Sequence, residues 1–430
     1  MLNINFERIK RIHFIGIGGI GISAIARMMF LEGKEVSGSD LVESIITKEL
    51  KKLGISIAFN ERAENISNDI DLVIYTIAIE PDNLELLKAK ELNIRVLTYP
   101  EVLGLISKEK YTIAIAGTHG KTTTTAMLAK VMVDADLKPT VIVGSLLDGQ
   151  TNFITGEGKY LVVEACEYRR SFLNLSPNIL IITNIDLDHL DYYKDLEDIQ
   201  DAFSELAGKI PEDGYLICDT NNKNLEPVIL KVSCKVIDYS TFNKEDIKLK
   251  VSTKYNRQNA CAVLSTSKIL GIIENQTKKS LEKFSGVWRR FQFRGRTKHG
   301  ALVYDDYAHH PTEISAMFEG AREMFPDKRI IAIFQPHLFS RTRDFLKGFS
   351  ECFKKADLII LIPVYEARKE LDHSVNSITL KDEIEKQNKE VLYFETIEET
   401  INYLKKENNS KDLIITIGAG NVYQIVDKLI

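Results

Sequence analysis

The chain has 430 residues, of which 44% are hydrophobic and 27% charged, so it is a folded protein that is too long for a single hydrophobic core. Its formal net charge of -5 gives no overall attraction for nucleic acid, and its five scattered cysteines include no C-x-x-C pair, which argues against a zinc site or a disulfide framework. The N-terminus lacks a signal pattern and no apolar run reaches about 18 residues, so the sequence predicts a cytoplasmic protein that does not enter a membrane.

Residues 1–108 predict a first α/β domain. Its apolar runs predict strands at 11–15, 35–39 and 71–76, and the segments between them predict helices at 23–33 and 83–92. Strands that alternate with helices favour a parallel sheet with helices on both faces.

A glycine-rich turn follows the first predicted strand. The turn has the pattern G-x-G-x-x-G, with glycines at Gly16, Gly18, Gly19 and Gly21, and Asp40 ends the second strand about 20 residues later. This pattern is typical of binding to NAD, FAD or another diphosphate, although it also suits a plain tight turn. Asp40 would reach a ribose hydroxyl, or it would cap a helix.

Residues 109–294 predict a second α/β domain that opens with a phosphate-binding loop. A buried strand at 111–116 runs directly into the sequence from Gly117 to Gly120, Lys121 and Thr122. Backbone N–H groups, the positive end of a helix dipole and the lysine ammonium would converge on one anion, while the threonine hydroxyl would bind Mg²⁺. ATP is the predicted ligand.

Polar residues follow two further predicted strands of this domain, at 160–164 and 179–183. Because the carboxyl ends of parallel strands share one edge of a sheet, Glu164 and the run 183–189 should face the phosphates. Glu164 and His189 would hold divalent metal ions, with Asp186, Asp188 and Asp191 nearby; alternatively, these carboxylates are solvated or cap a helix.

Residues 295–430 predict a third α/β domain with a last helix after residue 420. Its elements alternate along the chain, with strands at 302–304, 329–334, 357–362 and 413–417 and helices at 311–324 and 345–355. A further helix is predicted at 256–270, in the preceding domain. The segment 305–313 carries two acids and two histidines at a strand end, which suits a metal site, a general base pair or a polar cap about equally. His337, Arg341 and Arg343 follow another strand, and such arginines suit carboxylate recognition or a solvated surface.

The ordered set of motifs resembles the Mur ligase family through nearly the whole chain. The motifs that carry the resemblance lie at residues 16–24, 37–40, 117–122, 164–170, 183–189, 289–291, 305–311, 334–343 and 418–420. The resemblance implies three domains: a Rossmann-like domain that binds UDP, a central P-loop ATPase-like domain, and a Rossmann-like domain that brings an amino acid.

The family resemblance also implies roles for individual residues. It places the sugar nucleotide, UDP-N-acetylmuramate, at Gly16, Gly18, Gly19, Gly21, Ser39, Asp40 and Thr76. It places ATP at Gly117, Thr118, His119, Gly120, Lys121, Thr122, Thr123, Asn256, Asn259, Arg290 and Asp306. It places two Mg²⁺ ions at Thr122, Glu164 and His189, and L-alanine at Tyr307, His309 and Arg341, with catalysis by Lys121, Glu164, His189 and His309.

The implied reaction is ATP-dependent formation of an amide bond between L-alanine and UDP-N-acetylmuramate, in the synthesis of peptidoglycan precursors. The sugar carboxylate would attack the γ-phosphorus of ATP, and the alanine amine would then attack the resulting acyl phosphate. A tripeptide recycling ligase of the same family is the nearest alternative. From other classes, a NAD-dependent dehydrogenase or a non-catalytic nucleotide-binding regulator stays open, and the sequence does not give the oligomeric state.

Four departures from the family pattern bear on these expectations. The stretch between His189 and Asn256 is short, so part of a small antiparallel sheet in the central domain should be missing. Tyr255 replaces a histidine beside the two asparagines, and Leu338 replaces an arginine that many relatives carry. The run 371–374 replaces a turn that usually contains proline. The last two changes concern amino-acid selectivity.

Overall fold

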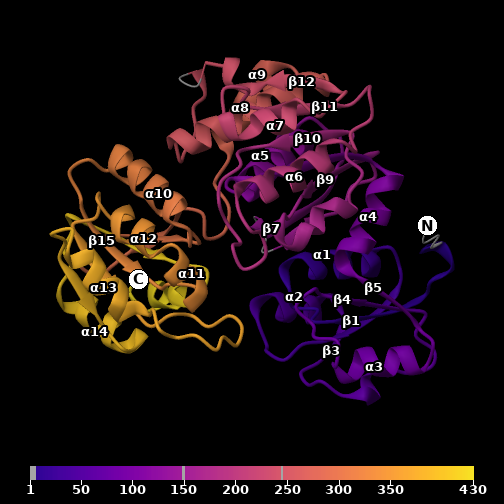
Figure 1. The fold of residues 1–430 in the computed structure, drawn as a ribbon, viewed down its shortest axis with the longest axis horizontal. Helices are drawn as coiled ribbons and strands as arrows, with labels where there is room; N and C mark the ends of the chain where they lie inside the picture. Colours follow the sequence, from indigo (N-terminus) through magenta and orange to yellow (C-terminus); the bar gives the residue numbers. More distant parts are fainter. Residues whose placement is uncertain (1–5, 148–150, 244–245) are drawn as a thin grey trace. The chain divides into compact units, whose positions relative to one another are not determined.

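The computed structural model describes residues 6–147, 151–243 and 246–430 (Figure 1). Within them, the chain forms two compact units. The first unit draws on the described residues of 6–186, 197–242 and 261–281, and the second on those of 187–196, 243–260 and 282–430. Two sheets belong to the first unit and a third sheet belongs to the second.

The first sheet has five parallel strands in the order β3-β2-β1-β4-β5. These strands are β1 (Arg11–Ile15), β2 (Glu35–Ser39), β3 (Ser56–Ala58), β4 (Leu72–Tyr75) and β5 (Arg95–Thr98), and the helices with them are α1 (Ile20–Leu31), α2 (Ile45–Leu53), α3 (Leu84–Glu91) and α4 (Tyr99–Glu109). The strand order reverses between β1 and β4. Ligands of open α/β sheets bind at such a point, and the glycine turn after β1 lies there.

The second sheet has seven strands in the order β12-β11-β10-β6-β9-β7-β8, and only the pair of β7 and β8 is antiparallel among the described strands. The strands are β6 (Tyr111–Ala116), β7 (Thr140–Leu147), β8 (Thr151–Ile154), β9 (Tyr160–Glu164), β10 (Ile179–Ile182), β11 (Tyr215–Cys218) and β12 (Lys235–Asp238). The helices are α5 (Lys121–Asp134), α6 (Leu196–Ala207), α7 (Glu226–Ile229), α8 (Lys254–Ile269) and α9 (Glu274–Lys283). Strand β6 lies between β9 and β10, so the phosphate loop is flanked by the polar ends of both neighbours.

The third sheet has six strands in the order β13-β14-β18-β15-β16-β17, with an antiparallel edge strand β13. The strands are β13 (Gln292–Arg296), β14 (Leu302–Asp306), β15 (Arg329–Phe334), β16 (Leu358–Leu361), β17 (Val391–Tyr393) and β18 (Asp412–Ile417). The helices are α10 (Pro311–Met324), α11 (Phe339–Asp344), α12 (Leu346–Cys352), α13 (Ser377–Glu385) and α14 (Ile397–Lys406). Because successive side chains of a strand point to opposite faces, Ile330 and Ile331 enter two separate buried clusters, one on each face of the sheet.

The predicted α/β alternation is confirmed, with differences at three helices. Helix α1 begins at Ile20, directly after the glycine turn, rather than at residue 23. The helix expected at 345–355 is α12, which is shorter and separated from α11 by the non-helical Phe345. The chain after residue 420 forms a 3-10 helix, Val422–Lys428, rather than an α-helix. No helix among the described residues is long and apolar enough to span a membrane.

Candidate active site

The glycine turn after β1 is closed by its own neighbours. The N–H groups of Gly16 and Ile17 both donate to the carbonyl of Ser39, at 2.9 and 3.0 Å. Gly16 has a φ of +74°, and a Cβ at this position would lie 2.6 Å from Thr76 Cγ2. The turn therefore requires glycine, and it lies beside Thr76 at the end of β4.

Asp40 and Ser39 are already engaged by protein groups. The Asp40 carboxylate accepts hydrogen bonds from the N–H groups of Gly18 at 2.8 Å and Val42 at 3.2 Å. The Ser39 hydroxyl donates to the buried Glu85 at 2.5 Å. Asp40 thus fixes the turn, and its contact with a ribose stays a prediction. Gly21 packs closely under Tyr99, since a Cβ there would lie 2.9 Å from the tyrosine ring.

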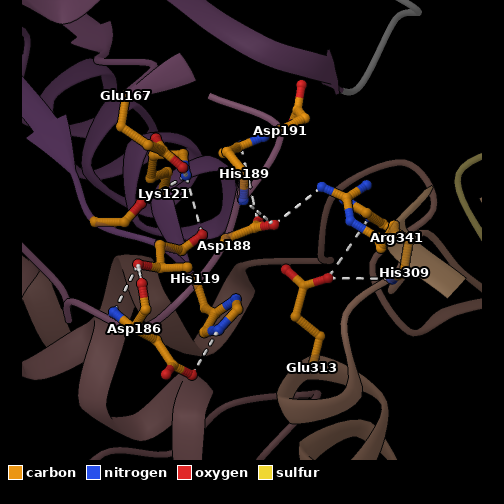
Figure 2. Close-up of polar contacts among 12 residues, drawn as sticks. His119, Lys121, Glu167, Asp186, Asp188, His189, Asp191, His309, Glu313 and Arg341 are labelled. Atoms are coloured by element: carbon orange, nitrogen blue, oxygen red, sulfur yellow. Dashed lines mark hydrogen bonds and ion pairs between the residues drawn. The ribbon is translucent and has the colours of Figure 1, made fainter. Parts of the chain in front are cut away.

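The phosphate loop joins β6 to α5 with Gly117 and Gly120 in left-handed conformations, at φ +130° and +85°. The ammonium of Lys121 folds back over the loop and donates to the carbonyls of Gly117 at 2.5 Å and Thr118 at 3.0 Å (Figure 2). It also forms an ion pair with Glu167 at 2.9 Å. Burial lowers the pKa of Lys121, but the negative charge of Glu167, the weaker influence of Glu164 and the hydrogen bond to Glu167 act together against it and leave the pKa raised. The lysine is therefore cationic.

Glu164 extends from the end of β9 toward Thr122 at the start of α5. One carboxylate oxygen accepts the Thr122 hydroxyl at 2.9 Å, and the other accepts the N–H of Gly144 at 2.8 Å. A Cβ on Gly144 would lie 2.7 Å from this carboxylate, so only glycine leaves room for it. A hydroxyl and a carboxylate side by side are the oxygen ligands that Mg²⁺ prefers. Thr122 and Glu164 could hold one ion together.

Residues after β10 brace the other side of the phosphate loop. The Thr183 hydroxyl donates to the carbonyl of His119 at 2.6 Å, and the Asn184 amide oxygen accepts the N–H of His119 at 2.9 Å. The ring of His119 lies 3.4 Å from the Asp186 carboxylate, and the Thr118 hydroxyl exchanges hydrogen bonds with the backbone of Asp186. The predicted proximity of this strand end to the loop is confirmed for these residues.

His189 belongs to the second compact unit, within the segment Leu187–Leu196. Its backbone is left-handed at φ +53°, and its N–H donates to the Asp188 carboxylate at 2.7 Å. Asp191 pairs with Arg368 at 3.0 Å. A metal ion shared by His189 and Glu164 stays a prediction.

Asp188 and Arg341 form a buried ion pair in the second unit, at 2.9 Å (Figure 2). Burial by itself raises the pKa of Asp188, but the guanidinium of Arg341 and the neighbouring histidines together outweigh it and hold that pKa well below the usual range. A second nitrogen of Arg341 lies 3.4 Å from His337 Nδ1. Arg341 was predicted to pair with the alanine carboxylate, and here its partner is a protein carboxylate.

Two aspartates end β14 and have different environments. Asp305 pairs with Arg289 at 2.8 Å, and this guanidinium also donates to the carbonyls of Gly418 and Gly420. Asp306 accepts N–H groups from Phe291 at 2.6 Å and Ala308 at 2.7 Å. Burial raises the pKa of Asp306 to about 6, opposed by Arg290. Arg289 thus links the end of β14 at Asp305 to the turn after β18, while Asp306 orients the loop that follows it.

His309 lies between charged groups of opposite sign. Its Nδ1 is 3.1 Å from the carbonyl of Tyr307 and 3.7 Å from the carboxylate of Glu313, which also lies 4.0 Å from Arg290. Burial, followed by the charge of Arg341, lowers the pKa of His309 to about 3. His309 is consequently neutral at pH 7.

The two asparagines predicted to bind adenine lie in α8. The Asn256 side chain donates to the carbonyl of Val251 at 3.0 Å, and Asn259 is buried. Tyr255 is 39% exposed and lines a pocket of about 440 Å³ together with Pro311 and Thr312. Adenine binding by Asn256 and Asn259 stays a prediction.

The structure thus brings together Thr122 with Glu164, and Tyr307 with His309. It also shows four contacts that sequence reasoning missed: Glu167 with Lys121, Gly144 with Glu164, Asp188 with Arg341, and Arg289 with Asp305. For Gly144 no sequence signal exists, because a glycine inside a strand pattern usually indicates only a bulge.

Comparisons with known proteins agree with this architecture. Three family profiles match in order: "Mur ligase family, catalytic domain" at residues 11–111, "Mur ligase middle domain" at 115–277 and "Mur ligase, glutamate ligase domain" at 289–420. The UDP-N-acetylmuramate–L-alanine ligase of Clostridium kluyveri is 41% identical over 452 residues, which cover 99% of this chain and 98% of that protein. The chain belongs to the Mur ligase family. Its three-domain α/β architecture is the one expected from the sequence.

Other relatives of this Mur ligase extend the comparison. The UDP-N-acetylmuramate–L-alanine ligase of Caldanaerobacter subterraneus is 39% identical over 100% of this chain and 99% of that protein. The crystal structure of UDP-N-acetylmuramate–alanine ligase from Thermotoga maritima superposes with a TM-score of 0.82 at 29% identity, covering 97% of this chain and 98% of that one. A murein peptide ligase from Psychrobacter arcticus has a TM-score of 0.72, 23% identity and 98% coverage of both chains, and shares the fold alone.

Proposed function

We propose that this Mur ligase joins L-alanine to UDP-N-acetylmuramate at the expense of ATP, through an acyl phosphate, in the cytoplasmic synthesis of peptidoglycan precursors. The observation that carries the proposal is the 41% identity with a UDP-N-acetylmuramate–L-alanine ligase over 99% of the chain. Lys121 of the first unit suits the transfer of a phosphoryl group, and Arg341 of the second unit suits the binding of an amino-acid carboxylate.

The first step transfers the γ-phosphoryl group of ATP to the sugar carboxylate. Lys121 would neutralise the charge that develops on the transferred group, and α5 would point its positive end at the phosphates. Mg²⁺ bound to Thr122 and Glu164 would supply further charge neutralisation, since two anions must approach each other. The protein's part is positioning and electrostatics rather than covalent chemistry.

The second step is attack of the alanine amine on the carbonyl carbon of the acyl phosphate, in which the C–N bond forms and inorganic phosphate leaves with the former carboxylate oxygen. Arg341 would bind the alanine carboxylate, and Tyr307 and His309 would line the pocket. Because the pKa of His309 lies at about 3, its neutral ring would accept a hydrogen bond from the amine but is too weak a base to hold a proton at pH 7. Its role would therefore be orientation.

A phosphate-release assay tests this function. Release should require UDP-N-acetylmuramate, L-alanine, ATP and Mg²⁺ together, and Lys121→Ala should abolish it in a folded protein, as judged by circular dichroism. Rapid release without the sugar nucleotide, or a tripeptide as the preferred acceptor amine, would contradict the proposal. Binding of NAD(H) with hydride transfer would favour a dehydrogenase. That alternative gives no role to Lys121 and Glu164.

A further inference from the structure

Each of the three N–H groups of the Lys121 ammonium has an acceptor within the protein. A lysine carries three N–H donors, and those of Lys121 are directed to the carbonyls of Gly117 and Thr118 and to the carboxylate of Glu167 (Figure 2). The side chains of Lys121 and Glu167 are only 13% and 5% exposed, so solvent screens this ion pair weakly.

A phosphate that binds Lys121 must therefore replace one of these three partners. The carbonyls of Gly117 and Thr118 belong to the loop that forms the phosphate cradle, and they are neutral. Glu167 is the anionic partner, and a carboxylate resembles a phosphate in charge and in the hydrogen bonds that it accepts. Glu167 and a nucleotide phosphate would compete for the same donor.

The backbone after Glu167 is strained. Arg169 and Arg170 are both left-handed, with φ of +49° and +55°, a conformation that is unfavourable for residues other than glycine. The Arg170 N–H donates to the carbonyl of Glu167 at 2.9 Å, and the Arg170 guanidinium is anchored to Asp198 at 2.6 Å. This tight turn directs the Glu167 side chain at Lys121, and strain of this kind accumulates at functional sites.

We infer that Glu167 is a positioning residue that occupies Lys121 in place of a nucleotide phosphate until ATP arrives. The pair keeps the lysine charged and folded back over the loop, so that an arriving phosphate meets a donor that is already in place. In exchange, nucleotide binding has to displace a carboxylate, which lowers the affinity for ATP. This inference depends on ATP binding at the phosphate loop, as in the proposed function.

The test measures nucleotide affinity without the other substrates. Titration calorimetry with Mg²⁺ and AMPPNP, a non-hydrolysable ATP analogue, is carried out on the full chain and on Glu167→Gln. The amide keeps the size and one acceptor but removes the competing charge, so AMPPNP should bind about fivefold more tightly or better. ADP should gain less, and adenosine, which lacks phosphates, should bind equally to both proteins.

Two further variants complete the test. Glu157→Gln removes a carboxylate whose side chain is 92% exposed, and it should leave all three affinities unchanged. Glu167→Asp withdraws the carboxylate by one methylene and should tighten AMPPNP binding to an intermediate degree, which covers the case that Glu167→Gln does not fold. A purely structural role for Glu167 predicts a lower melting temperature with unchanged or weaker AMPPNP binding, and that result would overturn the inference. Failure of the wild type to bind AMPPNP would instead refute the ATP site itself.

Discussion

The guanidinium of Arg341 donates to the Asp188 carboxylate at 2.9 Å, and each side chain is only 9% exposed. Two opposite charges buried this far depend on each other, because removing one leaves the other without compensation. An amino acid whose carboxylate reaches Arg341 must share that guanidinium with Asp188. The pair therefore belongs both to the stability of the second unit and to the proposed alanine pocket.

Arg341→Ala should raise the KM for alanine steeply and barely change the KM for ATP. Truncating one partner of a charged pair in a partly dry site costs roughly 2 to 5 kcal/mol. The melting temperature should also fall, because Asp188 loses its partner. Steady-state kinetics with alanine and ATP varied in turn provide the measurement.

The same variant should still form the acyl phosphate, since alanine enters only after the carboxylate has been activated. Exchange of the β,γ-bridging oxygen of labelled ATP, measured without alanine, should therefore persist. If exchange disappeared, or if both KM values rose equally, Arg341 would act in nucleotide binding or in folding, and the alanine pocket would lose its main support.

His309 should make the protein less stable in acid. Its pKa is about 3 in the folded state and about 6.5 in an unfolded chain, so between these values the unfolded state binds more protons. The contribution of His309 to the free energy of unfolding is therefore complete above about pH 6.5, and it falls by about 1.4 kcal/mol per pH unit as the pH drops toward the folded pKa. Denaturant unfolding at pH 7, 6 and 5 measures the effect.

Comparison with His309→Gln isolates the contribution of His309 from that of Asp306. The pKa of Asp306 is raised to about 6 in the folded state, so its contribution to the free energy of unfolding increases as the pH falls. The difference in unfolding free energy between wild type and variant should shrink as the pH falls. Two parallel pH curves would show that His309 is not buried in its neutral form.

Gly144→Ala should weaken the binding of the Mg²⁺ ion that Thr122 and Glu164 are proposed to hold. The new Cβ would lie 2.7 Å from the Glu164 carboxylate and push it away from Thr122. Changes in residues that support a metal ligand typically cost about 10- to 100-fold in metal affinity. The Mg²⁺ concentration for half-maximal phosphate release should rise accordingly.

Gly208→Ala is the matched control, because a Cβ there meets its nearest atom at 3.4 Å, an ordinary contact. This variant should require the same Mg²⁺ concentration as the wild type. Equal behaviour of the two variants would remove Glu164 from the metal site.

Much of the site on the second sheet could be predicted from sequence. The strand ends at Ala116 and Glu164 belong to neighbouring parallel strands, and this topology alone places Glu164 beside Thr122. The glycine pattern likewise predicted the turn after β1, in which Gly16 leaves no room for a side chain beside Thr76.

Contacts made by irregular segments could not be predicted in this way. Glu167 reaches Lys121 beside a turn with two left-handed arginines, and the spacing of apolar residues along the sequence does not predict such a turn. Asp188 and Arg341 are 153 positions apart, in segments joined only by the folding of the second unit. The same holds for the break between α11 and α12 at Phe345, since neither proline nor glycine marks that position.

Transfer of oxygen from the sugar carboxylate to phosphate tests the central claim most directly. UDP-N-acetylmuramate labelled with ¹⁸O in its carboxylate is turned over with ATP and L-alanine, and the released phosphate is analysed by mass spectrometry. An acyl phosphate intermediate predicts that each phosphate carries one oxygen from the carboxylate, while the amide product keeps the other. Unlabelled phosphate, or AMP as a product, would contradict phosphoryl transfer to the carboxylate and with it the proposed ligase mechanism.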